Sequence, residues 1–109
     1  MALLVESVRA VENLDEILSV DGVDEIHIGM ADLSQSLGLP GDVDNARVRA
    51  CAKLAVDRIV EAGKVAGCGA ASVAQAKEFF DRGVRSILVG AHTLFLEAGR
   101  HYVKSSGVD

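Results

Sequence analysis

The stretch of sequence that decides the fold is residues 24–34, which read DEIHIGMADLS. Within it, Ile26 and Ile28 share one side of the chain, while Glu25 and His27 share the other. This alternation of apolar and polar residues is the period-2 pattern of an extended strand with one buried face. The pattern therefore predicts a strand that ends at the glycine.

A long connection follows the strand predicted over residues 24–29. Gly38, Pro40 and Gly41 lie close together in it and interrupt regular structure. The sequence therefore predicts a long loop over residues 30–41, and such loops after strands often carry functional residues.

The same strand-helix unit occurs four times along the chain. Strands are predicted over residues 3–5, 24–29, 65–69 and 86–90. Each is followed by a segment with apolar residues at helical spacing. These residues are Val8, Val11, Leu14 and Leu18, then Val48, Ala52, Ala55, Ile59 and Ala62, then Val73, Ala76, Phe79 and Phe80, and last Leu94, Leu96 and Tyr102.

Capping residues support these helix boundaries. Ser7, Ser72 and Thr93 each precede or open an apolar periodic segment, where a hydroxyl can accept a hydrogen bond from a free backbone N–H. Gly63 and Gly83 stand where the second and third helices should end.

Four strand-helix units in strict alternation predict an α/β fold with parallel strands joined by right-handed crossovers. A closed barrel of eight such units takes about 250 residues, so a chain of 109 residues has the size of half a barrel. The alternative is an open parallel sheet with helices on both faces. Short helices, and two strands followed by carboxylates, favour half of a (β/α)8 barrel over the open sheet.

Composition narrows the class of protein. The chain is 50% hydrophobic and 25% charged, which suits one folded domain over residues 1–109. Its net charge of -5 opposes nucleic-acid binding. No apolar run approaches the roughly 20 residues of a membrane span, and no secretory signal pattern is visible, so we expect a cytoplasmic protein.

The two cysteines, Cys51 and Cys68, do not have the spacing of a zinc site, and they do not form a disulfide framework. Both are predicted to be buried thiols.

Two carboxylates stand where parallel strands end. Glu6 follows the first strand, and Asp32 lies just past the second. Adjacent parallel strands are about 4.8 Å apart, so the two carboxylates can converge on one cation. Oxygen ligands completed by water and substrate are typical of Mg²⁺ and Mn²⁺. The simpler alternative is that both are solvated or capping carboxylates at loop starts.

The ordered motifs resemble those of the HpcH/HpaI aldolase family. The resemblance rests on LLVES at 3–7, AVENLDEI at 10–17, DGVD at 21–24, IGMADLS at 28–34, LG at 37–38 and PG at 40–41. Later matches, AGK at 62–64, RGV at 82–84 and ILVG at 87–90, extend it over essentially the whole chain.

The resemblance implies a metal-dependent aldolase on a (β/α)8 barrel that cleaves 4-hydroxy-2-oxo acids to pyruvate and an aldehyde. Glu6 and Asp32 match the family's ligands for Mg²⁺, Mn²⁺ or Co²⁺. Ala31 and Asp32 match positions whose backbone amides meet the substrate carboxylate. The chain corresponds to the second half of the family's barrel, so the first half, with its base-positioning His and substrate-binding Arg, has no counterpart here.

Several positions depart from the family's pattern. Leu4 stands where many members carry a polar residue, Met30 where proline is common, and His92 where an Asp is usual. His27 is expected to be a core histidine and His101 to be exposed. The glycines of the later strands resemble those of phosphate-binding loops, yet close packing explains them better without a converging basic side chain; they are Gly67, Gly69 and Gly90.

Two hypotheses remain open from the sequence. In the first, the chain is the C-terminal half of a class II pyruvate aldolase, whose activity requires the missing N-terminal half. The expected protein partner is that half-barrel or, in a homo-oligomer, another copy of the chain. In the second, it is a catalytically inactive half-barrel that acts as a binding or assembly module. The family assembles through its last helices, which directs attention to Leu94, Phe95 and Leu96 as an oligomer surface.

Overall fold

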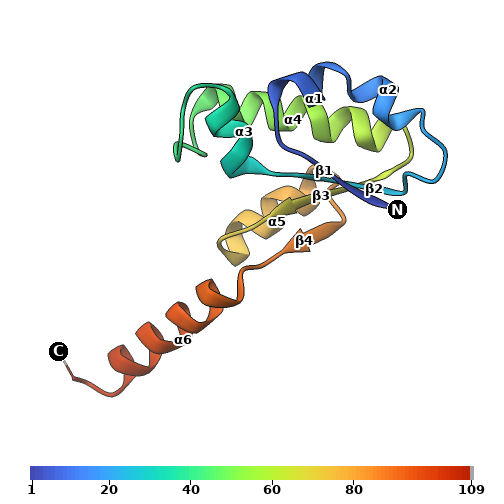
Figure 1. Ribbon diagram of the computed structural model, residues 1–109. Helices are drawn as coiled ribbons and strands as arrows, with labels where there is room; N and C mark the ends of the chain where they lie inside the picture. The colour runs from blue at the N-terminus through green and yellow to red at the C-terminus, as the bar shows by residue number, and fades with distance from the viewer. Residues whose placement is uncertain (109) are drawn as a thin grey trace.

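The computed structural model describes residues 1–108 and contains one four-stranded parallel sheet (Figure 1). Its strands follow the chain in the order β1-β2-β3-β4. Helices alternate with them, which confirms the α/β prediction. The elements are β1 (Ala2–Val5), α1 (Val8–Glu12), α2 (Leu14–Leu18), β2 (Glu25–Ile28), α3 (Met30–Ser36), α4 (Ala46–Glu61), β3 (Val65–Gly69), α5 (Val73–Asp81), β4 (Ser86–Leu88) and α6 (Ala91–Ser105).

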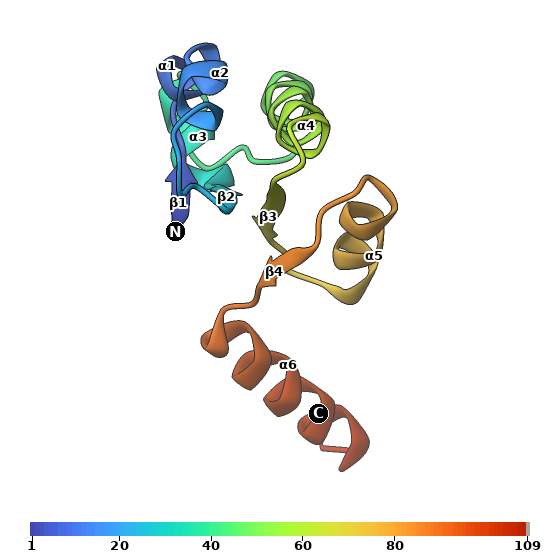
Figure 2. The ribbon, with the colours of Figure 1, turned by 90° about the vertical axis from the view of Figure 1, so that its right-hand side faces the viewer.

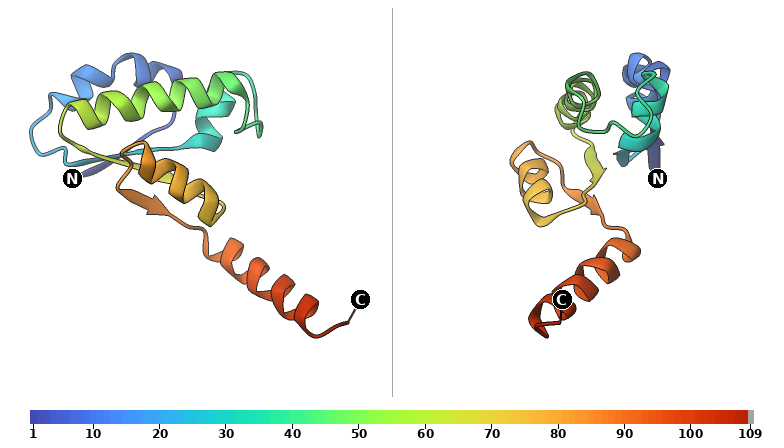
Figure 3. Two further views of the ribbon diagram at one scale, coloured as in Figure 1. Left: turned by 180° about the vertical axis from the view of Figure 1, so that it is seen from behind. Right: turned by 90° about the vertical axis from the view of Figure 1, so that its left-hand side faces the viewer.

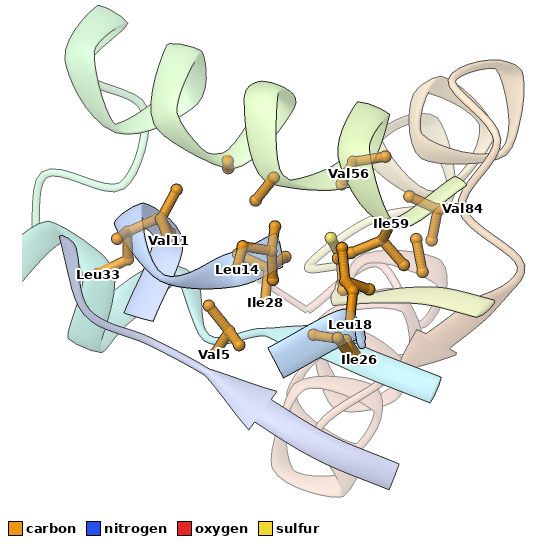
Figure 4. Packing of buried hydrophobic residues seen from close by; sticks show 14 of the residues in the cluster. Val5, Val11, Leu14, Leu18, Ile26, Ile28, Leu33, Val56, Ile59 and Val84 are labelled. Atoms are coloured by element: carbon orange, nitrogen blue, oxygen red, sulfur yellow. The ribbon is translucent and has the colours of Figure 1, made fainter. Parts of the chain in front are cut away.

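Helices cover only one face of the sheet, and the hydrophobic core lies there (Figure 4). Alternate strand residues point into this core, and the apolar stripes of α1, α2 and α4 meet them. The buried strand residues are Val5, Ile26, Ile28, Ala66 and Cys68. On the opposite face, the side chains of Leu4 and Leu88 are 57% and 60% exposed. The alternative with helices on both faces is therefore excluded for the described residues.

The first helical segment is split, whereas one helix was predicted from Val8 to Leu18. Asn13 separates α1 from α2 with φ −90° and ψ 15°, outside the regular helical region. The apolar spacing continues across the break because Val11, Leu14 and Leu18 all reach the same core. Periodicity alone thus could not reveal the interruption.

The predicted long loop over residues 30–41 was wrong, because its first part is the helix α3. Met30, Leu33 and Leu37 have helical spacing, and all three pack on or in the core. Gly38, with a φ of 75°, then takes a left-handed conformation directly after the helix. The glycines therefore end a short helix rather than prevent one.

Most predicted capping residues are confirmed. The hydroxyl of Ser7 accepts a hydrogen bond from the N–H of Ala10 at 3.2 Å, and that of Ser72 accepts one from Gln75 at 3.2 Å. Gly63 follows α4 with a φ of 71°. The prediction for Thr93 was wrong: α6 begins at Ala91 after the N-cap residue Gly90, so Thr93 lies inside the first turn.

The two cysteines are free thiols with different surroundings. Cys68 is buried, and burial raises the pKa of its thiol to about 11. Cys51 is only half-buried, so the prediction of two buried thiols held for one of them, although burial also raises the pKa of Cys51. The two adjacent phenylalanines of α5 also differ in burial. Phe79 packs against the core, while Phe80 is exposed.

Helix α6 extends away from the rest of the molecule (Figures 2 and 3). None of its residues is buried, and the molecule accordingly measures 55 × 28 × 21 Å. Leu94, Phe95 and Leu96 are exposed, as is the side chain of His101. Among the described residues, no helix combines the length and apolarity needed to cross a bilayer.

Candidate metal and substrate site

The candidate site lies at the edge of the sheet where all four parallel strands end (Figure 1). Val5 and Ile28 are paired as the last residues of β1 and β2. One more ladder bond follows, in which the N–H of Gly29 donates to the carbonyl of Val5 at 2.9 Å. This bond brings the start of the connection after β2 beside Glu6, the first residue after β1.

Gly29 makes room for the carboxylate of Glu6. A Cβ atom at position 29 would lie 2.8 Å from the Cβ of Glu6 and 3.0 Å from its Oε2. The first distance is shorter than real Cβ contacts and the second is very tight, so a side chain here would push Glu6 aside. The absence of a side chain at Gly29 is therefore a condition for the position that Glu6 takes.

Asp32 reaches the same edge through α3, which begins directly after Gly29. Asp32 lies in the first turn of this helix and is exposed. The next two residues are buried, and the hydroxyl of Ser34 donates to the carbonyl of Ala31 at 2.6 Å. A further bond, from the N–H of Val8 to the Ser36 hydroxyl at 3.0 Å, joins α1 to α3. The structure thus places both predicted carboxylates at one edge of the sheet.

The donor set at this edge consists of carboxylate oxygens. Residues 1–108 contain no cluster of three or more His, Cys, Asp or Glu side chains that could hold a metal ion. Glu6 and Asp32 would therefore be two ligands of a coordination sphere that other oxygens complete. Such an oxygen-only set suits Mg²⁺ and Mn²⁺.

The start of α3 also offers backbone donors. The first N–H groups of a helix lack partners within it, and the first backbone bond into α3 is that from Leu33 to the carbonyl of Gly29, at 2.9 Å. The N–H groups of Ala31 and Asp32 precede it. They are the two positions that the sequence matched to the substrate carboxylate.

His27 belongs to the inner face of the sheet and not to this edge. Its side chain is 12% exposed, and its Nε2 contacts a carboxylate oxygen of Glu25 and lies 3.1 Å from the Ser86 hydroxyl. The Ser86 hydroxyl and the His27 ring hold the pKa of Glu25 below its ordinary value. The Nδ1 atom of His27 is buried, without a hydrogen-bond partner among the described residues. His27 is therefore partly buried on the inner face of the sheet, opposite the hydrophobic core, so the prediction of a core histidine was wrong.

The His27 ring lies across Gly67 and so links β2 to β4 over the strand between them. A Cβ atom at Gly67 would lie 2.4 Å from the Cε1 and Nε2 atoms of the ring. Close packing, and not phosphate binding, explains this glycine. Sequence reasoning missed Ser86, because nothing in the local pattern shows that a serine 59 residues away reaches His27.

The short distance between Gly67 and the His27 ring predicts that Gly67→Ala destabilises the fold by about 1–3 kcal/mol, the usual cost of overpacking a filled position. The ring of His27 would have to leave its place between Glu25 and Ser86. Urea unfolding measures the loss. Gly69→Ala is the matched control, because the nearest atom to its new Cβ is the Leu88 carbonyl oxygen at 3.9 Å. Equal losses in the two variants would contradict this packing.

His92 stands beside the edge after β4. It is exposed, and a Cβ atom at Gly90 would lie 2.7 Å from its Cε1, so the ring occupies the space that this glycine leaves open. The Thr93 hydroxyl lies 3.4 Å from His92 Nε2. Because Gly90 and His92 are both exposed, this contact is not the close packing that the sequence predicted for the glycine at 90. The nearest atom to a Cβ at Gly69 is 3.9 Å away, so of the three glycines only Gly67 is explained by close packing.

Comparisons with known proteins agree with this geometry. The model of a family described as HpcH/HpaI aldolase/citrate lyase matches residues 1–96. A 2-keto-3-deoxy-L-rhamnonate aldolase from Klebsiella pneumoniae is 43% identical over 94 residues, which are 86% of this chain and 35% of that protein. The aldolase of the same description from Escherichia coli is 41% identical over 90 residues, covering 83% and 34% of the two chains.

Solved structures of proteins from this family superpose on almost the whole chain. An HpcH/HpaI aldolase/citrate lyase family protein from Burkholderia cenocepacia superposes with a TM-score of 0.90 at 28% identity, over 96% of this chain and 41% of that one. An HpcH/HpaI aldolase from Desulfitobacterium hafniense gives 0.82 at 26% identity, over 99% and 43%.

The chain spans about a third of the length of the curated relatives that it matches. Its four strands correspond to part of the (β/α)8 barrel of the structural relatives, which confirms the predicted fold class. With the edge carboxylates and the match over residues 1–96 in agreement, the chain belongs to the HpcH/HpaI aldolase/citrate lyase family.

Proposed function

We propose that the chain forms the C-terminal half of a class II pyruvate aldolase, and that the complete barrel cleaves 4-hydroxy-2-oxo acids to pyruvate and an aldehyde. The observation that carries the proposal is the placement of Glu6 and Asp32 at one edge of the sheet, with Gly29 opened to admit the Glu6 carboxylate. Similarity to 2-keto-3-deoxy-L-rhamnonate aldolases supports a 2-oxo acid as the substrate class.

In this proposal Glu6 and Asp32 hold a divalent cation, Mg²⁺, Mn²⁺ or Co²⁺. Such a cation supplies Lewis-acid stabilisation of negative charge on the substrate's 2-oxo oxygen. The backbone N–H groups of Ala31 and Asp32 bind the substrate carboxylate, a role that the small side chain of Ala31 leaves unobstructed. Burial of Leu33 and Ser34 fixes the turn that carries these groups.

In this proposal the half-barrel binds the cation and the substrate carboxylate, and it supplies no side chain that transfers a proton. Its catalytic residues would come from the missing N-terminal half, to which the resemblance assigns the base-positioning His and the substrate-binding Arg. Residues 1–109 then act as one domain that depends on that half or on a homo-oligomer for a closed site. The expected partner in the site is a small 2-oxo acid, with no nucleic acid or membrane involved.

A catalytically inactive binding or assembly module is the second candidate. It is favoured by Leu4, whose apolar side chain is exposed on the inner face where many family members carry a polar residue. Adding the first half of a family member's barrel separates the two functions. Pyruvate release should appear if the chain is half of an aldolase, and it should not appear if the chain is an inactive module.

The direct test of the metal site is a Mn²⁺ titration of the chain, followed by water proton relaxation. We expect weak binding, with a dissociation constant of about 10⁻⁴–10⁻³ M, because two carboxylates are only part of a coordination sphere. Asp32→Asn should abolish it. The control is Asp81→Asn, which removes an exposed carboxylate at the end of α5. Equal binding by Asp32→Asn and the unaltered chain would refute the site.

A further inference from the structure

A small cavity lies in the helical layer between α4 and α5, on the covered face of the sheet. Its volume is about 30 Å³. The wall is formed by α3, α4, β3, α5 and the residue that follows α5 before β4, so the whole cavity lies within residues 30–84 and away from the open edges of the sheet. Its apolar wall residues are Met30, Ala52, Val56, Cys68, Phe79 and Val84, of which Val56 and Val84 are labelled in Figure 4.

The floor of this cavity suits one methyl-sized group better than a water molecule. A water takes about 30 Å³ in the liquid and needs two to four hydrogen-bonding partners when it is buried. Val56, Cys68 and Val84 are buried in this wall. Among them only Cys68 has a polar side-chain atom, a thiol that is a weak hydrogen-bonding group and that stays uncharged because burial raises its pKa to about 11. The floor therefore favours an apolar group.

The mouth of the cavity, where it opens to solvent, is positively charged. Arg49 of α4 and Arg82 of α5 line it, and both donate to the same carboxylate oxygen, Oε1 of Glu78, at 2.7 and 2.8 Å. Asp44 approaches Arg49 only to 3.9 Å. Lys53, the third basic residue of the lining, has its own carboxylate partner one turn along α4 at 2.6 Å. Two guanidiniums that share one carboxylate oxygen leave positive charge at the mouth.

We infer that this cavity binds a short-chain monocarboxylate of about two to four carbon atoms. Its methyl end fills the apolar floor, and its carboxylate meets the guanidiniums of Arg49 and Arg82, which match carboxylate geometry. Met30 connects the cavity to the start of α3, because it lies between Gly29 and Ala31. The binding site includes neither of the proposed metal ligands and does not rest on the proposed function.

The experiment is a titration of the ¹⁵N-labelled full 109-residue chain with sodium propionate, followed by amide NMR at an ionic strength held constant with sodium chloride. We expect saturable shifts of the amides around the cavity and at residues 30–32. The expected dissociation constant is about 1–10 mM, within the limit for a ligand of about five heavy atoms. Propylammonium, a chain of similar length with the opposite charge, should leave these amides unchanged.

Two charge variants should change the affinity in opposite directions. Glu78→Gln frees both guanidiniums and should lower the propionate dissociation constant about fivefold, the upper range for an exposed ion pair. Arg82→Gln leaves Glu78 to balance Arg49 and should raise the constant about fivefold or more. Asp81→Asn and Lys77→Gln are the matched controls. They make the same charge changes at exposed positions of α5 outside the cavity lining and should bind as the unaltered chain does.

A third variant tests the apolar floor. Ala52→Leu fills the cavity and should abolish the propionate-dependent shifts. Ala46→Leu, at an exposed position of the same helix, should keep them. The amide spectrum of each variant also shows whether it is folded.

Three results would overturn the inference. They are the absence of saturable shifts with propionate, equal shifts with sodium chloride or propylammonium, and an affinity that Glu78→Gln and Arg82→Gln both leave unchanged. Each is distinguishable from failure of the proposed function, because the Mn²⁺ titration depends on Glu6 and Asp32 and none of these variants alters either residue.

Discussion

Pyruvate release by the completed barrel should fall about 10³-fold or more when Glu6 is replaced by Gln. The substitution keeps the size of the side chain and removes one of two charges that would hold the cation. Lewis-acid stabilisation is worth several kcal/mol, and each 1.36 kcal/mol of barrier is a factor of ten in rate. The structure supports this choice of residue because the Glu6 carboxylate lies in the space left by Gly29.

The measurement uses the chain co-expressed with the N-terminal half of the Klebsiella pneumoniae 2-keto-3-deoxy-L-rhamnonate aldolase, its 43% identical relative. Pyruvate is followed with a coupled dehydrogenase. Glu12→Gln, an exposed glutamate at the end of α1, is the control and should retain full activity. The chain alone should stay at the metal-only background. Turnover by the chain alone that Glu6→Gln abolishes would show that the catalytic groups lie in this half.

The fold class was predictable because it rests on local patterns that repeat. Alternation in residues 24–28 and apolar stripes such as that of α4 are properties of neighbouring residues. The apolar residues of both patterns are buried, except Ala62 at the end of the stripe. The errors have a different origin. Asn13 breaks a helix without breaking its apolar stripe, and Met30, Leu33 and Leu37 form a helix in a segment whose glycines suggested a loop.

Part of the candidate site was predictable from local sequence patterns, and part of it was not. Glu6 and Asp32 could be placed at one edge from the sequence, because parallel strands end together. Two other features depend on contacts between strands and leave no local signal: the opening at Gly29 for Glu6, and the link from His27 to Ser86 across Gly67. A glycine in a strand suggests close approach, but only the fold shows which side chain approaches.

Ile59→Ala should lower the free energy of unfolding by about 2–5 kcal/mol, the range for truncating a large aliphatic side chain in a core. Ile59 is 0% exposed and points from α4 into the cluster that contains Leu18, Ile26 and Val84 (Figure 4). Helices cover only one face of this sheet, so the cluster has no second core layer across the strands to share the loss.

A loss of this size is a large fraction of the roughly 5–15 kcal/mol that stabilises a typical domain. Leu54→Ala on the same helix is the control, since Leu54 is exposed and its truncation should change stability by less than about 0.5 kcal/mol. Urea unfolding followed by circular dichroism, at one protein concentration for all variants, gives both values. The concentration is fixed because unfolding of an associated chain depends on it. If both truncations cost the same, α4 does not pack on the sheet through the face that carries Ile59.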